Sequence, residues 1–246
     1  SKMNSKMGDR VARWQALYDQ AAKPGARVFR TVARRAGEDI TSTEAQAFVA
    51  QQASGQIFQG RLPSDGKVTS SREDMRWQAD LMDMSKKASS KRDGAAKYAL
   101  MVTDIFTKEI FVETMMDKTD AEAKSAMRKI LNSNQGVDPK EISVDLGREF
   151  GPSFQEMMKD KGIVVRKKDP QAVNSIAAVD RAMQSVKSIL KNVQEGGWAK
   201  GIKRATSLYN DREHSALYGA APDDVKDNKV LQYQLEAEAG GKVKHN

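Results

Sequence analysis

Apolar residues recur at helical spacing through the first fifty residues of the chain. The first helix, predicted at 10–22, carries one apolar stripe: Val11, Trp14, Leu17 and Tyr18. A second helix is predicted at 26–36, with apolar residues on one side, arginines on the other and Gly37 just beyond its end. The Ser/Thr-rich segment 41–44 offers cap residues to a third helix. Residues 1–58 are therefore predicted to form a small all-helical module, of helix-turn-helix type or a simple packing module.

From residue 75 the pattern changes to short, largely apolar runs that are typical of strands. Five strands are predicted, at 77–84, 98–106, 110–112, 141–145 and 163–165, with a hairpin turn at 85–94 after the first. Helices are predicted at 120–131, 153–161, 175–191 and 198–209. A three-strand meander followed by alternating helices and strands predicts an α/β fold, a mixed five-stranded sheet with helices on its faces. The predicted domains are a linker at 59–74, a core at 75–226 and a charged tail at 227–246.

Composition narrows the chemistry. The chain has no cysteine and only two histidines, which excludes disulfides and leaves no ligand set for a structural zinc site. No apolar run approaches the roughly 18 residues of a membrane helix, and no signal peptide opens the chain. We therefore expect an intracellular protein, nuclear if the source is eukaryotic, without membrane contact.

The charge is unevenly distributed. Lys and Arg number 41 against 33 Asp and Glu, a formal net charge of +8, and most of this excess falls in the first 70 residues. Such a balance suits a polyanionic partner such as DNA without proving one. The arginines of the second predicted helix are candidates for DNA contact, and the alternative is that they are simply solvated.

Three short stretches each carry one aspartate beside apolar residues: Trp77-Gln78-Ala79-Asp80-Leu81, Val144-Asp145-Leu146 and Val179-Asp180-Arg181. A carboxylate within a buried strand is costly unless it is paired or binds a metal. Taken alone, Asp80 or Asp145 would more simply cap a turn at the end of a strand. Three such carboxylates favour a two-metal site for phosphoryl transfer.

The same motifs carry a family resemblance. The chain resembles retroviral-type integrases, most closely those of Maverick/Polinton self-synthesising elements and related retroelements. The matching segments occur in family order across roughly residues 75–226: 77–84, 103–108, 117–119, 145–150, Tyr209-Asn210 with His214, and Ala221-Pro222 with Val225. The resemblance implies a ribonuclease H-like fold. It also implies a DNA integrase that processes the 3′ ends of mobile-element DNA and transfers them into target DNA.

By this resemblance Asp80, Asp145 and Asp180 are the catalytic and metal-binding carboxylates, with Mg²⁺ as the cofactor and Mn²⁺ able to substitute. Integrases of this type carry Glu at the third position, so Asp180 is one methylene shorter, although mariner-type transposases are similar in using Asp at this spacing. The resemblance therefore implies either an active transferase or a domesticated core that binds DNA without joining it. A zinc module of two His and two Cys, common in the family, is absent from this sequence.

Basic and polar residues near the third aspartate are the predicted DNA contacts. Gln184, Lys187 and Lys191 follow Asp180 at +4, +7 and +11 on one helix face, where integrases are similar in placing side chains that meet DNA ends. The cluster Arg166, Lys167 and Lys168 is predicted to open the loop before this helix and to contact phosphates. The alternative for both sets is an ordinary solvated basic surface. A homo-oligomer is expected, because joining two DNA ends at one target needs at least two active sites.

Several nearby residues remain open. Asp83 and Asp104 are alternative carboxylates, of which Asp104 is interpreted as structural because it precedes a turn. Glu149 is close enough to Asp145 to support it. His214 is interpreted as a packed residue. A nuclease acting on RNA–DNA hybrids is a weaker alternative, since it would need a fourth carboxylate.

Overall fold

The computed structural model describes residues 2–52, 68–168, 177–193 and 196–243. Contacts divide the chain into two compact units, Ser1–Pro63 with Lys191–Val193, and Ser64–Leu190 with Gln194–Asn246. More than half of the predicted linker at 59–74 lies outside the described residues. The predicted domain boundaries at 58, 74 and 226 therefore stay predictions.

The first unit contains the three predicted helices, α1 (Lys2–Gln20), α2 (Ala26–Arg35) and α3 (Ser42–Gln52). Their core is aromatic, with Phe29 stacked on Phe48 at 4.9 Å between ring centroids and Trp14 edge-on to Phe48 at 5.8 Å. A capping box begins α3, because the Thr41 hydroxyl accepts the Glu44 N–H and the Glu44 carboxylate accepts the Thr41 N–H. Helix α1 starts eight residues earlier than predicted, at Lys2.

The second unit is built on the predicted mixed five-stranded sheet, in the order β3-β2-β1-β4-β5. Its strands are β1 (Arg76–Asp83), β2 (Tyr98–Asp104), β3 (Ile110–Met115), β4 (Glu141–Val144) and β5 (Val164–Lys167). The first three form an antiparallel meander, and β4 and β5 continue the sheet parallel to β1. Strand β3 continues three residues beyond its predicted end at 112. It is the edge strand and most of its side chains are partly exposed, so no continuous apolar run marks these residues in the sequence.

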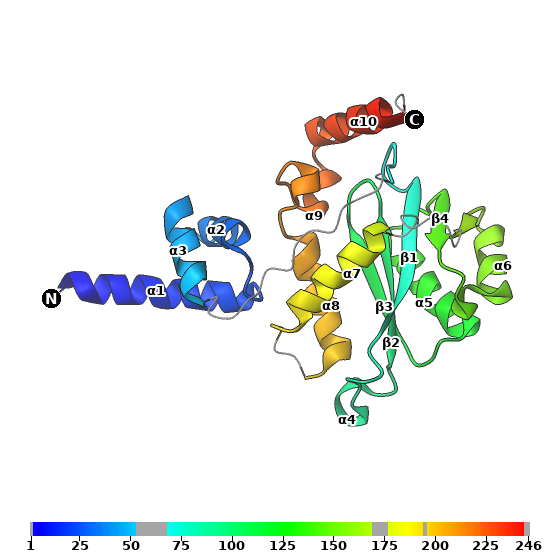
Figure 1. Ribbon diagram of the computed structural model, residues 1–246, viewed down its shortest axis with the longest axis horizontal. Coiled ribbons are helices and arrows are strands. Elements are labelled where there is room, and N and C mark those ends of the chain that lie inside the picture. Colours follow the sequence, from blue (N-terminus) through cyan, green and yellow to red (C-terminus); the bar gives the residue numbers. More distant parts are fainter. Residues whose placement is uncertain (1, 53–67, 169–176, 194–195, 244–246) are drawn as a thin grey trace. The chain divides into compact units, whose positions relative to one another are not determined.

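Helices cover both faces of this sheet (Figure 1). Helices α5 (Asp120–Ser133) and α6 (Pro152–Asp160) lie on one face, and α7 (Ala177–Leu190) and α8 (Trp198–Asn210) on the other. Successive side chains of a strand point to opposite faces. In β1, Trp77 and Ala79 therefore pack in the apolar core with α5 and α6, while Gln78 and Asp80 face α7.

Short elements complete the unit. The segment 85–94 connects the antiparallel strands β1 and β2, as predicted for a hairpin, and contains a short helix, α4 (Ser90–Asp93). The Asp93 carboxylate accepts the N–H groups of Ser89 and Ala199. After η2 (Ser215–Leu217) come α9 (Pro222–Val225) and α10 (Lys229–Val243). The C-terminal helix packs with α9, η2 and the turn after β2 in one buried cluster: Phe106, Leu217, Val225, Leu231 and Leu235. Among the helices described, none combines the length and the apolar character that crossing a membrane requires.

Candidate active site

Strands β1 and β4 place two of the three predicted carboxylates side by side. The parallel register pairs Arg76 with Glu141 and Gln78 with Ser143. Continued by two residues, this register brings Asp80 opposite Asp145, which follows the last residue of β4. Residues in register on neighbouring strands point to the same face of a sheet, so both carboxylates belong to the α7 side. The Asp145 carboxylate also accepts the Gly147 N–H at 2.9 Å, which orients it at the end of the strand.

Helix α7 brings the third carboxylate to the same face. Asp180 lies in the first turn of α7, which packs against β1 and β2 through Val179, Ala182, Met183 and Val186. The start of this helix is tied to β1, because the Gln78 side-chain oxygen accepts the N–H groups of Ala178 and Val179 at 3.0 and 3.1 Å. The residue before Asp180 is therefore bonded to the residue two positions before Asp80.

The charges of the neighbouring carboxylates act on Asp80. The pKa of Asp80 is raised from 3.8 to about 6, first by burial and also by the charges of Asp145, Asp180 and Glu149, while the hydrogen bond from the Leu81 N–H opposes the shift. Across the sheet, Asp80 faces the fully buried Met101, which explains the desolvation. A site in which several carboxylates repel one another favours a bound cation.

Glu149 is the fourth carboxylate of this group. It lies in the short helix η1 (Arg148–Phe150) and is only 8% exposed. Its carboxylate folds over Gly147 so closely that a Cβ at position 147 would come within 2.5 Å of the Glu149 Oε2. A side chain at position 147 would therefore displace the Glu149 carboxylate from this position. The charge of Glu149, the residue that the sequence left open, contributes to the raised pKa of Asp80.

The donor set fits a hard divalent cation. Carboxylate oxygens are the ligands that Mg²⁺ and Mn²⁺ prefer, and no thiolate is present to select zinc. Within the described part of the chain, however, no three acidic or histidine side chains stand close enough together to hold a metal ion as they are. The residues therefore fit in chemistry and in charge, but their side chains are not drawn together as a ligand set.

The predicted DNA contacts on α7 are exposed. Gln184 and Lys187 lie on the solvent side of the helix, one and two turns beyond Asp180 on the same face. Lys191 is also exposed and follows the end of α7 by one residue. Their contact with DNA stays a prediction.

The basic cluster before α7 is arranged differently from its prediction. Arg166 and Lys167 do not open a loop, since they are the last two residues of β5. Arg166 is paired with Glu141, whose carboxylate also binds Arg76, so its charge is partly neutralised. Strand β5 extends further because Arg166 and Lys167 pair in register with β4 although their side chains are exposed. Lys168 follows the strand, and residues 169–176 lie outside the described residues.

Other polar residues near the site prove structural. The buried Asp104 carboxylate accepts hydrogen bonds from the N–H groups of Asp74, Phe106 and Thr107, as a turn-forming residue should. Asp83 is exposed and caps the turn at Ser85. His214 packs edge-on against Tyr209 at 4.5 Å between ring centroids. The interpretations of Asp104 and His214 as structural residues are thus confirmed.

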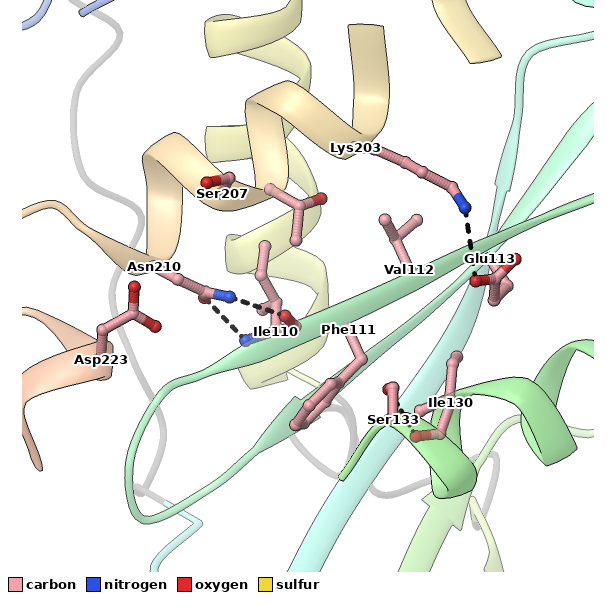
Figure 2. A pocket seen from close by; sticks show the side chains of 11 residues that line it. Ile110, Phe111, Val112, Glu113, Ile130, Ser133, Lys203, Ser207, Asn210 and Asp223 are labelled. Carbon is pink, nitrogen blue, oxygen red and sulfur yellow. Dashed lines mark hydrogen bonds and ion pairs between the residues drawn. The ribbon is translucent and has the colours of Figure 1, made fainter. Parts of the chain in front are cut away.

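A pocket of about 380 Å³ lies elsewhere, beside the edge strand β3 (Figure 2). Asn210 of α8 brackets the start of this strand, since its amide donates to the Ile110 carbonyl and accepts the Ile110 N–H, both at 2.9 Å. Lys203 reaches Glu113 across the pocket at 3.5 Å. None of the predicted site residues lines it. The carboxylate group therefore lies on the α7 face, and not in this pocket.

Sequence reasoning missed Gln78 as a site residue. The available signal was a polar side chain in an otherwise apolar strand, two residues before the first aspartate. Its partners are 100 residues away in the sequence, and their amide groups carry no sequence signature.

Comparisons with known proteins bear on the fold and the core segment of the chain. Residues 70–172 match the family model described as "Integrase core domain", a range that contains Asp80 and Asp145 and ends before Asp180. Among 333 matching chains of solved structures is one from the simian T-cell lymphotropic virus intasome in complex with the PP2A regulatory subunit B56 gamma. It is 16% identical, with a TM-score of 0.56, over 83% of this chain and 75% of that chain. No curated protein matches. The ribonuclease H-like integrase core fold is thereby confirmed, and the comparisons support a function of the integrase or transposase type.

Proposed function

We propose that this protein is a divalent-metal-dependent DNA integrase that processes the 3′ ends of mobile-element DNA and joins them to target DNA. The proposal starts from an integrase core fold with a matching core-domain segment. The observation that carries it is the convergence of Asp80, Asp145 and Asp180, from two strands and a helix, on one face of the sheet.

In this mechanism Asp80, Asp145 and Asp180 would hold Mg²⁺ or Mn²⁺, and the bound ions would supply activation of the attacking oxygen and charge stabilisation of the leaving oxygen of a phosphodiester. The attacking oxygen belongs to water in end processing and to a DNA 3′-hydroxyl in joining. The protein forms no covalent bond to DNA. Its contribution is to hold the backbone of Asp80 within β1, of Asp145 at the end of β4 and of Asp180 at the start of α7, so that few atoms must move for the carboxylates to bind the cation.

Exposed basic residues supply the DNA contacts in this proposal. Gln184, Lys187 and Lys191 would follow the phosphate backbone along the face that Asp180 begins, and Lys167 and Lys168 would contact it from the end of β5. The net charge of +8 favours such binding at low salt. We also propose that the protein acts as a homo-oligomer, because two DNA ends must be joined at one target.

The test is a nicking and joining assay on short duplexes that carry the element's terminal sequence, with Mg²⁺ or Mn²⁺. Wild-type protein is compared with Asp145→Asn, and Asp160→Asn at the exposed end of α6 is the matched control. We expect metal-dependent joining by the wild type and the control and at least a hundredfold loss in Asp145→Asn. Equal activity of Asp145→Asn and wild type would refute the proposal.

A second candidate is a domesticated core that binds DNA without joining it. It is favoured by the shorter Asp180 and by the carboxylates that, in the described residues, do not yet form a ligand set. Folded wild-type protein that binds authentic ends but never joins them would establish this candidate. An Asp180→Glu variant that gained joining would show that the site has degenerated, whereas a loss would show that Asp is the working ligand.

A further inference from the structure

We propose that Gln78 is a positioning residue, which fixes Asp180 beside Asp80 by capping helix α7 from strand β1. The inference rests on the proposed function, because it assigns Asp180 a place in the same metal site. Gln78 stands inside the first aspartate motif and the matched core segment, and the inference assigns it a role there.

The first step is the chemistry of the helix start. The first N–H groups of a helix have no acceptor within the helix and are normally satisfied by the side chain of a Ser, Thr, Asp or Asn just before it. In α7 the N–H groups of Ala178 and Val179 are the second and third of the helix, and both bond to the Gln78 oxygen at 3.0 and 3.1 Å. A side chain from a strand thus does the work of an N-cap residue.

The second step is burial. Gln78 is 1% exposed and Val179 is fully buried, so loss of the Gln78 oxygen would leave the Val179 N–H away from water. Buried amide groups without partners are strongly disfavoured. The hydrogen bonds from Gln78 are therefore buried and fix the distance between the start of α7 and β1.

The third step is the distance to the carboxylates. Gln78 and Asp80 lie on the same face of β1, two residues apart, and Asp180 follows directly after Val179. Side chains of a helix tilt towards its N-terminus, so the Asp180 carboxylate is directed back to the tethered end. Because Asp180 is a short side chain, the helix must lie close to β1 for its carboxylate to share a cation with Asp80, and Gln78 supplies that closeness.

The experiment compares Gln78→Leu, which keeps the bulk and removes the acceptor, with Gln78→Glu, which keeps an acceptor oxygen. Gln232→Leu is the matched control. The Gln232 amide of α10 donates to the Val225 and Lys226 carbonyls at the end of α9, both at 2.8 Å, so it also joins two elements by side-chain hydrogen bonds. If Gln78→Leu does not fold, Gln78→Asn, whose amide is one methylene shorter, takes its place. All are made in the full chain, and their melting temperatures are recorded.

The first readout is hydrogen exchange of the Ala178 and Val179 amides. We expect both to exchange at least tenfold faster in Gln78→Leu, and at the wild-type rate in Gln78→Glu and Gln232→Leu. The second readout is Mn²⁺ binding by calorimetry, without DNA. The dissociation constant should rise about tenfold or more in Gln78→Leu, as is usual when a group that orients a metal ligand is removed, and should not rise in the other two variants.

Unchanged hydrogen exchange of the Ala178 and Val179 amides in Gln78→Leu would refute the proposal that Gln78 caps α7. Faster exchange with unchanged Mn²⁺ binding would show that the cap is structural only and would overturn the positioning role. Failure of the proposed function gives a different pattern, in which wild-type protein neither binds Mn²⁺ nor joins DNA. The positioning role then falls with the metal site, while hydrogen exchange still decides the cap.

Discussion

The substitution Asp80→Asn should stabilise the metal-free protein at neutral pH. The pKa of Asp80 is raised to about 6 in the folded protein, whereas an aspartate in the unfolded chain has the ordinary value of 3.8. Between these values the folded state holds a proton that the unfolded state has lost, so the Asp80 contribution to stability falls as the pH rises through this window. Above about pH 6 the charge is present in both states and its full penalty remains. Asparagine removes the charge and keeps an oxygen to accept the Leu81 N–H.

The size of the effect follows from the shift. A shift of about two units corresponds at most to about 3 kcal/mol, and solvent contact of the partly exposed Asp80 reduces this to about 1–2 kcal/mol. For a chain of this size, about 1–2 kcal/mol raises the melting temperature by roughly 2–6 °C. At pH 4 the gain should vanish, because Asp80 is then protonated when folded.

The assay is thermal unfolding with a chelator at pH 4 and pH 7.5, for wild type, Asp80→Asn and the exposed control Asp160→Asn. Only the difference between proteins is used, since all other groups titrate alike in each. Added Mg²⁺ should then stabilise the wild type more than the variant, because a bound cation relieves the repulsion. A variant less stable than wild type at pH 7.5, or equally favoured at both pH values, would refute the electrostatic argument.

Three further predictions concern single regions. Asp104→Ala should lower the free energy of unfolding, measured by urea denaturation, by about 3–5 kcal/mol, because several buried donors lose their acceptor. The exposed control Asp83→Ala should lower it by less than about 1 kcal/mol. Similar losses in the two variants would contradict the structural role of Asp104. Lys187→Glu should weaken duplex DNA binding several-fold in fluorescence anisotropy and lower the number of counterions released on binding by about one. The control Lys159→Glu on α6 should do neither. Equal effects of the two substitutions would indicate that only the net charge of the protein matters. Arg34→Glu at the exposed end of α2 should likewise weaken DNA binding without changing the melting temperature, and unchanged affinity would leave the first unit a simple packing module.

Much of the fold follows from local patterns in the sequence. Alternation and apolar runs locate β1, β2 and β4 within one or two residues, because these strands are buried and their side chains pack. The pattern weakens where packing is one-sided. Strand β5 continues through Arg166 and Lys167 because backbone pairing with β4 holds it, and no apolar side chain marks that pairing.

The site was predictable only in part, for a similar reason. Asp80 and Asp145 stand out because a carboxylate beside apolar strand residues is unusual, and Asp180 follows from its spacing and family resemblance. The register that aligns Asp80 with Asp145, and the bonds from Gln78 to the start of α7, join residues far apart in the chain. Only the folded structure brings them together.

The most direct test of the proposed metal site is the joining rate of Asp180→Asn, because Asp180 is the proposed ligand that stands where the integrases that the sequence resembles carry Glu, and it lies beyond the matched core segment. The joining rate is measured with Mg²⁺ on short DNA duplexes that carry the element's terminal sequence, at equal DNA occupancy for wild type and variant. We expect at least a hundredfold loss, equal to that of Asp145→Asn. Joining at the wild-type rate by Asp180→Asn, while Asp145→Asn is inactive, would contradict it and would direct attention to Glu149 as the third carboxylate.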